Sequence, residues 1–206
     1  WLDALEVVGT EMVDVFTREI ADRRTTPRGD LISALVAAMD GGDTLTLDEV
    51  LGALVLTIIA GHDTTSNSMT LGARALARDP AAWAQLRAHP EHSVEAVLEL
   101  MRYSAMSTAQ PRLAGQDFDW HGHKIRQSDL VFLMIAGGNR DPKVFAEPDR
   151  LDISRVNDAS LTFAPGLHHC IGHMLAKLQL GEFFAQLTRR FDRLEILQEP
   201  ELVPNL

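Results

Sequence analysis

The 206-residue sequence is poor in cysteine, in positive charge and in long apolar runs. Its single cysteine excludes an internal disulfide and suits a reducing compartment such as the cytoplasm. Its 19 basic residues against 29 acidic ones give a formal net charge of −10, which argues against a nucleic-acid-binding surface. The longest apolar stretch, Val50 to Ala60, is too short to span a bilayer. With 46% hydrophobic residues, the composition is that of a soluble globular protein able to bury a substantial core.

Helical patterns dominate the chain, with a short region of strand character. We expect a helix over 1–24, a second from Leu31 to Met39 capped by Asp30, and a long one that starts at a capping box at Thr46 and continues to Pro80. Further helices are expected over 81–88, capped by Asp79 and Pro80, and from Ser93. Short apolar runs between polar turns predict strands at 112–114, 118–120, 124–125 and 130–135.

The only cysteine, Cys170, lies in the stretch FAPGLHHCIGH at residues 163–173. Apolar residues follow it at helical spacing, at Ile171, Met174, Leu175 and Leu178. We therefore expect Cys170 at the N-terminus of an amphipathic helix, where free backbone N–H groups and the helix dipole favour a thiolate. Gly166 permits a tight turn, and Gly172 removes a side chain where a flat partner could approach. Such a thiolate, with one face covered by Phe163, is a good axial ligand for haem iron.

Two other interpretations of this cysteine stay open from the residues alone. A lone cysteine in an apolar helix is most often a small buried residue. The cluster of His168, His169, Cys170 and His173 is also a candidate zinc site. Zinc needs converging ligands, however, and adjacent His168 and His169 tend to point apart.

Three motifs in one order resemble the cytochrome P450 monooxygenases. The pattern F-x-x-G-x-x-x-C-x-G at 163–172 is similar to the family's haem-ligand signature. AGHDTT at 60–65 lies upstream, and ELMR at 99–102 lies between the two. The resemblance runs nearly end to end but corresponds to about the C-terminal half of a family member. It implies a mostly α fold with a small β region, a single partial domain over 1–206, and a missing N-terminal half and extreme C-terminus.

The resemblance also implies a haem b cofactor and a set of residues around it. The residues expected to hold or line it are Cys170 as iron ligand, Phe163, Gly166, Gly172, His168, Arg112, Ala60 and Gly61. Arg112 and His168 match partners of the haem propionates, although an exposed strand arginine is the simpler interpretation of Arg112. Ala60 and Gly61 leave room for dioxygen. Asp63 and Thr64 would handle protons there, the alternative being a tolerated polar patch in a core helix.

One feature of the resemblance concerns folding rather than chemistry. Glu99 and Arg102 are adjacent on a helix surface and, taken alone, would form a solvated ion pair of little consequence. The family uses the corresponding pair as a buried brace with a second arginine, for which Arg150 and Arg155 are both candidates. The sequence departs from the family at Ala164, where glycine is usual, and at Arg126 and Asp129, where proline and glycine are usual.

The expected function is insertion of one oxygen atom of O2 into a hydrophobic small molecule. The resemblance implies electrons from NAD(P)H through a reductase and a ferredoxin-type iron–sulfur protein, because the sequence contains no flavin or nucleotide motif. Neither nucleic acid nor membrane is an expected partner, and the expected location is cytoplasmic. The alternatives are a peroxide-using or inactive haem-thiolate protein and, less favoured, a zinc-binding domain.

Overall fold

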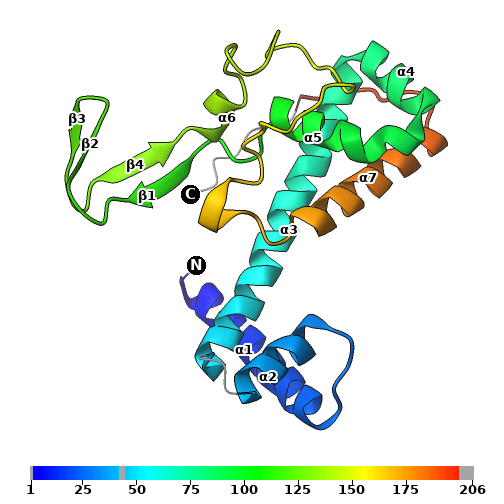
Figure 1. The fold of residues 1–206 in the computed structure, drawn as a ribbon. Coiled ribbons are helices and arrows are strands. Elements are labelled where there is room, and N and C mark those ends of the chain that lie inside the picture. Colours follow the sequence, from blue (N-terminus) through cyan, green and yellow to red (C-terminus); the bar gives the residue numbers. More distant parts are fainter. Residues whose placement is uncertain (1, 42–44, 200–206) are drawn as a thin grey trace. The chain divides into compact units, whose positions relative to one another are not determined.

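The computed structural model describes residues 2–41 and 45–199, which are mostly helical with two small two-stranded sheets (Figure 1). The chain divides into two compact units, residues 1–63 and 64–206, and the long helix α3 (Leu47–Arg78) contributes to both. Within the described residues, no helix is both long and apolar enough to cross a membrane.

The first unit contains α1 (Leu2–Thr25), α2 (Leu31–Asp40) and the start of α3, around a small core of Ile20, Val36, Val50 and Leu54. Asp30 caps α2 as predicted, since its carboxylate accepts the Ser33 N–H at 2.8 Å. That hydrogen bond, helped by the Arg23 guanidinium at 2.8 Å, lowers the pKa of Asp30 to about 2. The cap therefore stays charged throughout the physiological pH range.

The start of α3 confirms the predicted capping box. The Glu49 carboxylate accepts the Thr46 N–H at 2.7 Å, and the Thr46 hydroxyl accepts the Glu49 N–H at 3.3 Å. From Leu47 the helix runs unbroken for 32 residues and carries the AGHDTT motif near its middle.

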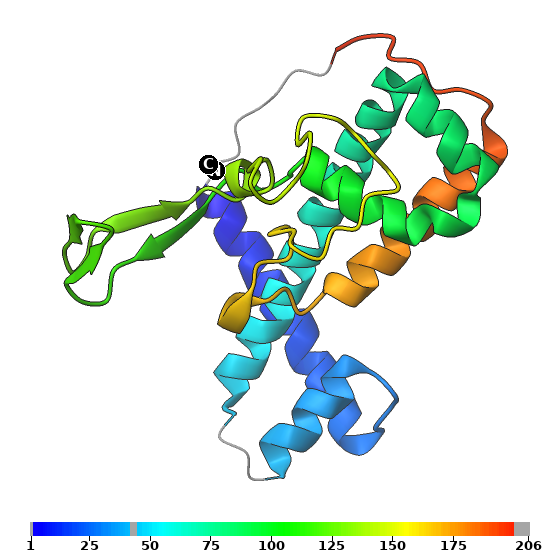
Figure 2. The ribbon, with the colours of Figure 1, turned by 45° about the horizontal axis from the view of Figure 1, so that its top comes forward.

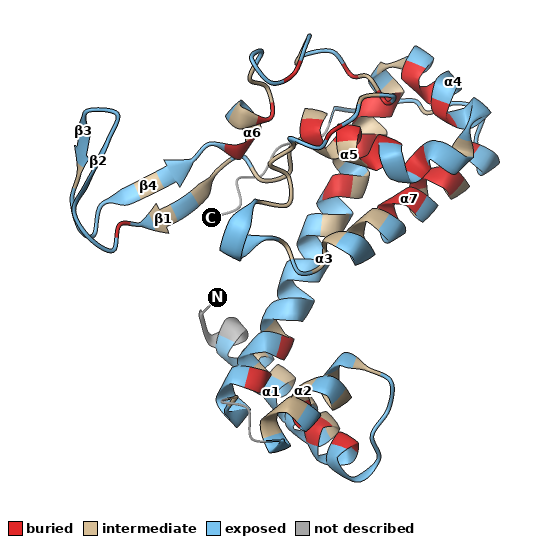
Figure 3. Ribbon diagram, viewed as in Figure 1, coloured by how far each residue is buried: buried red, intermediate tan, exposed pale blue. Residues whose placement is uncertain are grey.

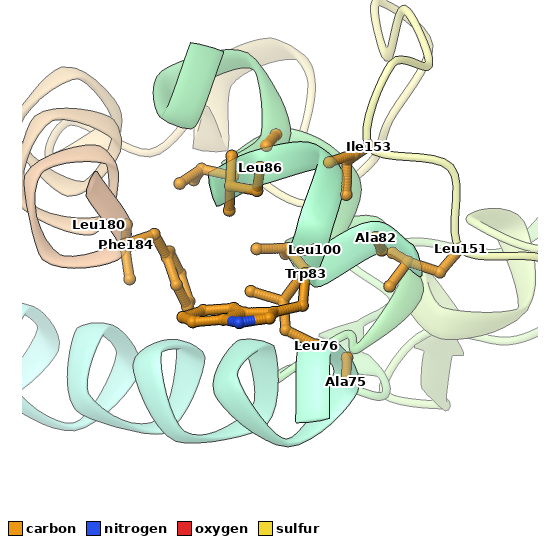
Figure 4. Close-up of a cluster of buried hydrophobic side chains, with 12 residues drawn as sticks. Ala75, Leu76, Ala82, Trp83, Leu86, Leu100, Leu151, Ile153, Leu180 and Phe184 are labelled. Carbon is orange, nitrogen blue, oxygen red and sulfur yellow. The ribbon is translucent and has the colours of Figure 1, made fainter. Parts of the chain in front are cut away.

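The second unit is built on α4 (Pro80–Ala88), the short turn η1 (Pro90–His92), α5 (Ser93–Tyr103) and α7 (His173–Arg190). Asp79 caps α4 as expected, accepting the N–H groups of Ala81 and Ala82. Trp83, Leu100 and Phe184 meet in the core of this unit, with Leu76 from α3 (Figure 4). The burial pattern in Figure 3 shows this core as the densest run of buried residues, on α4, α5 and α7.

Glycines let two helix pairs of this core approach closely. A Cβ added at Gly181 of α7 would lie 2.7 Å from Val94 Cγ2 and 3.3 Å from Val94 Cα of α5. A Cβ added at Gly72 of α3 would lie 2.6 Å from the Phe184 ring. These helices therefore pack closer than a larger residue at either position would allow.

The β region consists of two antiparallel pairs, and the inner pair in sequence forms the far end of the same ribbon (Figure 2). Strand β1 (Gln110–Leu113) pairs with β4 (Leu130–Leu133), and β2 (Phe118–Trp120) pairs with β3 (His123–Ile125). The Asp129 carboxylate accepts the Arg126 N–H at 2.8 Å, so Asp129 itself closes the turn where the family usually has glycine.

One expectation for an apolar segment is wrong. The strand expected over 130–135 ends at Leu133, because Ile135 is buried and begins the short helix α6 (Ile135–Gly138). The apolar residues that follow Cys170 at helical spacing are exposed, Ile171 by 96% and Met174 by 67%, with Leu175 and Leu178. The buried side of α7 lies further along, at residues such as Leu180 and Phe184.

Candidate functional site

Cys170 lies in a closed loop between the turn η2 (Gly166–His168) and α7. Its N–H donates to the Phe163 carbonyl at 2.9 Å, and its half-buried side chain carries a free thiol. Helix α7 begins at His173 with Gly172 as its N-cap, so Cys170 lies just ahead of a helix N-terminus, as predicted. A Cβ added at Gly172 would come 3.9 Å from Cys170 Sγ, so the glycine keeps one side of the sulfur open.

The loop contains two residues in the left-handed backbone region. Gly166, with φ of 77°, makes the tight turn that the sequence predicted. Ala164 has φ of 52°, a conformation that favours glycine, which is the residue usual here in the family that the chain resembles.

Histidines fix the loop through its backbone rather than through the thiol. His169 Nδ1 lies 2.9 Å from the Ala164 carbonyl, and His173 Nδ1 lies 2.9 Å from the Cys170 carbonyl. The two rings meet edge to face at 4.5 Å, with Phe163 6.0 Å from His173. In the described part of the chain, no three His, Cys, Asp or Glu side chains group to hold a metal ion, which counts against the zinc interpretation.

Other predicted site residues lie on separate elements. His168 is exposed at the end of η2, and Phe163 is half-buried with Lys177 Nζ 5.6 Å from its ring centre. Arg112, on β1, is half-buried and donates from Nη1 to the Pro111 carbonyl at 2.8 Å. Their expected contacts with a haem remain predictions.

The first five residues of the AGHDTT motif occupy exposed positions near the middle of α3, and the last, Thr65, is half-buried. Ala60, Gly61 and Asp63 belong to the first unit, and Thr64 begins the second. A Cβ added at Gly61 would meet nothing within 4 Å. The Thr64 carbonyl accepts the Ser68 hydroxyl at 2.7 Å, a bond from the following turn of the same helix.

Glu99 and Arg102 form a fully buried pair, each side chain 0% exposed. Arg102 donates from Nε and Nη2 to the two carboxylate oxygens of Glu99, at 2.7 and 2.9 Å. Arg155 Nε donates to Glu99 Oε1 at 3.3 Å, whereas the Arg150 side chain pairs with Glu147 at 2.8 Å. The second arginine of the brace is therefore Arg155.

Asn139 makes buried contacts that the sequence did not indicate. It is fully buried, its carbonyl accepts Arg102 Nη1 at 2.7 Å, and its Oδ1 accepts the Leu161 N–H at 2.8 Å. Its Nδ2 also donates to the Thr162 hydroxyl at 3.3 Å, next to Phe163. Asn139 thereby links the Glu99–Arg102 pair to the segment that enters the cysteine loop. Its only sequence signal was the turn-forming run GNRDP.

Comparison with known proteins gives one consistent family. Residues 6–205 match the family described as Cytochrome P450. The "Polyketide biosynthesis cytochrome P450 PksS" of Bacillus subtilis is 36% identical over 192 residues, 93% of this chain and 47% of that protein. "Nocardicin C N-oxygenase" of Nocardia uniformis is 35% identical, covering 96% of this chain and 50% of that protein.

A solved structure gives the same result at the level of the fold. The structure of P450BioI in complex with an acyl carrier protein ligated to hexadec-9Z-enoic acid superposes with a TM-score of 0.84 at 33% identity. It covers 92% of this chain and 49% of that one. The chain thus spans about half the length of the relatives that it matches.

Proposed function

Because this chain belongs to the cytochrome P450 family, we propose that it acts in a haem-dependent monooxygenase, transferring one oxygen atom of O2 to a hydrophobic small molecule. The observation that carries the proposal is the free, half-buried thiol of Cys170 in a loop held by its own backbone just ahead of α7.

The residues around Cys170 fit a haem. The loop is held by hydrogen bonds to backbone carbonyls from the Cys170 N–H and from His169, Gly172 leaves one side of the sulfur open, and Leu167 and Ile171 present exposed apolar side chains beside it. A thiolate ligand and an apolar surface suit an iron porphyrin. When bound, the haem supplies activation of O2 by electrons received from a redox partner.

Each predicted site residue then has a task in the proposal. Cys170 would ligate the iron, while Phe163, Gly166 and Gly172 shape its loop and Arg112 and His168 bind the propionate carboxylates. On α3, Ala60 and Gly61 would leave space for O2. The Asp63 carboxylate would relay protons, and the Thr64 hydroxyl would donate a hydrogen bond at the place where O2 is activated.

The proposed electron source is NAD(P)H, through a reductase and a ferredoxin-type protein in the cytoplasm. The likeness to P450BioI, solved with an acyl carrier protein, supports a second form of substrate, an apolar chain presented on a carrier protein. Two titrations of the haem-loaded protein distinguish the two forms, one with a free fatty acid and one with the same acid on a carrier protein. Binding is measured in each as the shift of the haem absorption spectrum.

The test of the proposal is the carbon monoxide difference spectrum of the reduced, haem-loaded protein and of its Cys170→Ala variant. We expect the red-shifted Soret band of cysteinate-ligated haem in the parent and its complete loss in the variant, with loss of monooxygenation. A band that persists in Cys170→Ala would make the ligand assignment wrong. A band without NAD(P)H-dependent turnover, but with turnover on added peroxide, would favour the peroxide-using alternative.

The proton role of Thr64 predicts a change in coupling rather than in binding. Thr64→Ala should bind substrate and consume NAD(P)H, but form several-fold less product for each hydrogen peroxide released. Thr57→Ala is a matched control, an exposed threonine of α3 whose hydroxyl donates to the Ala53 carbonyl at 2.7 Å. Equal ratios of product to peroxide in both variants and the parent would contradict the role.

A further inference from the structure

A cavity of about 560 Å³ lies in the second unit, among the C-terminal part of α3, the end of α5, the start of α6 and the segment before Leu151. Its size is that of a small-molecule pocket. Its charged lining side chains are Arg74, Arg78, Arg140, Arg150, Asp79 and Asp149, an excess of two positive charges.

Two of these arginines already have acidic partners in the neighbouring loop. Arg140 pairs with Asp149 and donates from Nη2 to the Tyr103 carbonyl at 2.8 Å. Arg150 pairs with Glu147 at 2.8 Å. The other two arginines of the wall, Arg74 and Arg78, form no ion pair with a residue that lines the cavity, within the part of the chain that the structure describes.

Arg74 and Arg78, one turn apart on α3, share a single carboxylate that comes from outside the wall. Glu199 accepts Arg78 Nη2 at 2.5 Å and Arg74 Nη2 at 3.2 Å. Asp79, the acidic neighbour of Arg78, uses its carboxylate to cap α4. Two guanidinium groups thus face one carboxylate.

The hydrogen-bonding capacity of Arg74 is also incompletely used. Its Nε is buried and has no hydrogen-bond partner among the residues that the structure describes. A buried guanidinium N–H without an acceptor is unfavourable. The outer part of the Arg74 side chain, which is 34% exposed, is the part that a second oxyanion could reach.

We propose that Arg74 and Arg78 form a binding site for the phosphate or carboxylate group of a small molecule, and that the carboxylate of Glu199 occupies this site as an internal competitor. Planar guanidinium groups suit both oxyanions. The apolar side chains of Leu71, Ala75 and Ala105 in the same wall would contact the body of the ligand. The site is separate from the proposed haem chemistry and does not depend on it.

Competition by Glu199 gives the proposal a specific signature. The Glu199 side chain is 57% exposed, so its replacement by glutamine removes a charge without disturbing the core. If the arginine pair binds external oxyanions, removing the internal carboxylate must strengthen that binding, whereas removing either arginine must weaken it.

The test is calorimetric titration of the full chain with inorganic phosphate and, separately, with acetate, at constant ionic strength in chloride. We expect binding of one anion, weakened about tenfold or more in Arg74→Gln and Arg78→Gln and strengthened at least about threefold in Glu199→Gln. Arg24→Gln, which removes an arginine paired with Asp40 in the first unit, should bind like the parent. A preference for phosphate or for acetate assigns the ligand group.

Circular dichroism and thermal unfolding establish that each variant is folded. If Arg74→Gln does not fold, Arg74→Lys, which retains the charge, replaces it in the titration. Binding that is equal in the arginine variants, the Arg24→Gln control and the parent would overturn the site. Equal affinity of Glu199→Gln and the parent for the anion would also overturn the site. Glu199 would then only attach its own segment to α3.

Discussion

Ala164 holds a left-handed backbone conformation that is about 1–2 kcal/mol less favourable for alanine than for glycine. Two contacts keep it there. Its N–H donates to the Leu161 carbonyl at 3.0 Å, and its carbonyl lies 2.9 Å from His169 Nδ1. The cysteine loop therefore stores backbone strain at one residue, six positions before the proposed iron ligand.

We predict that Ala164→Gly raises the free energy of unfolding by about 1 kcal/mol, because relief of strain exceeds the added freedom of the unfolded chain. Urea unfolding measures the change. Ala159→Gly, at an exposed loop alanine without positive φ, is the control and should lower stability by about 0.5–1 kcal/mol. Equal losses in both variants would show that Ala164 is not strained.

At the scale of elements, α5 is fixed to the loop that follows α6 through one arginine and one glutamate. Arg102 Nη1 donates to the carbonyls of Asn139 and Pro148, at 2.7 and 2.9 Å. Glu99 Oε1 accepts both the Asp152 N–H and Arg155 Nε. Removing the carboxylate charge would leave two guanidinium groups uncompensated beside a closed core.

Glu99→Gln should therefore cost about 3–5 kcal/mol of stability even though glutamine keeps the size and one acceptor oxygen. Glu95→Gln on the same helix, at an exposed position, should change stability by less than about 0.5 kcal/mol. Chemical unfolding of both variants measures the difference. If Glu99→Gln and Arg102→Gln gave additive losses below 1 kcal/mol in a double-mutant cycle, the buried pair would not act as a unit.

Helix starts were the part of the fold best predicted from sequence, because a cap is a local interaction. Asp30, Thr46 and Asp79 each bond N–H groups within three residues, so the signal and its structural effect lie together. Ile135 was misassigned to a strand because its burial, which the apolar run does not specify, decides its conformation.

The candidate site divides in the same way. The position of Cys170 before a helix followed from neighbouring residues, whereas Arg155 and Asn139 act across 56 and 37 residues of sequence. Candidate arginines could be named in advance, but choosing between Arg150 and Arg155 required the folded loop. The Nε of Arg74, which has no partner among the described residues, likewise had no sequence signal.

At the scale of the whole molecule, the residues around Cys170 expose an unusual amount of apolar surface. Leu167 and Ile171 are 104% and 96% exposed, and Met174, Leu175 and Leu178 continue the exposed set along α7. Contiguous apolar patches of this kind are normally covered by another part of a protein or by a ligand. The relatives are about twice as long as this chain, and we expect the additional residues in those proteins to help cover the corresponding surface.

The 206 residues expressed alone should consequently self-associate, bind an apolar dye such as ANS, and take up haem weakly, because half of a haem-binding surface leaves the porphyrin open to water. Size-exclusion chromatography, dye fluorescence and haem titration measure these properties. Replacing Ile171 and Leu178 together by glutamine should lower dye binding and association, whereas Val156→Gln, at an exposed loop valine, should change neither. A monomer that binds one haem stoichiometrically with a cysteinate spectrum would instead show that these residues suffice, and that the exposed set is closed by the haem itself.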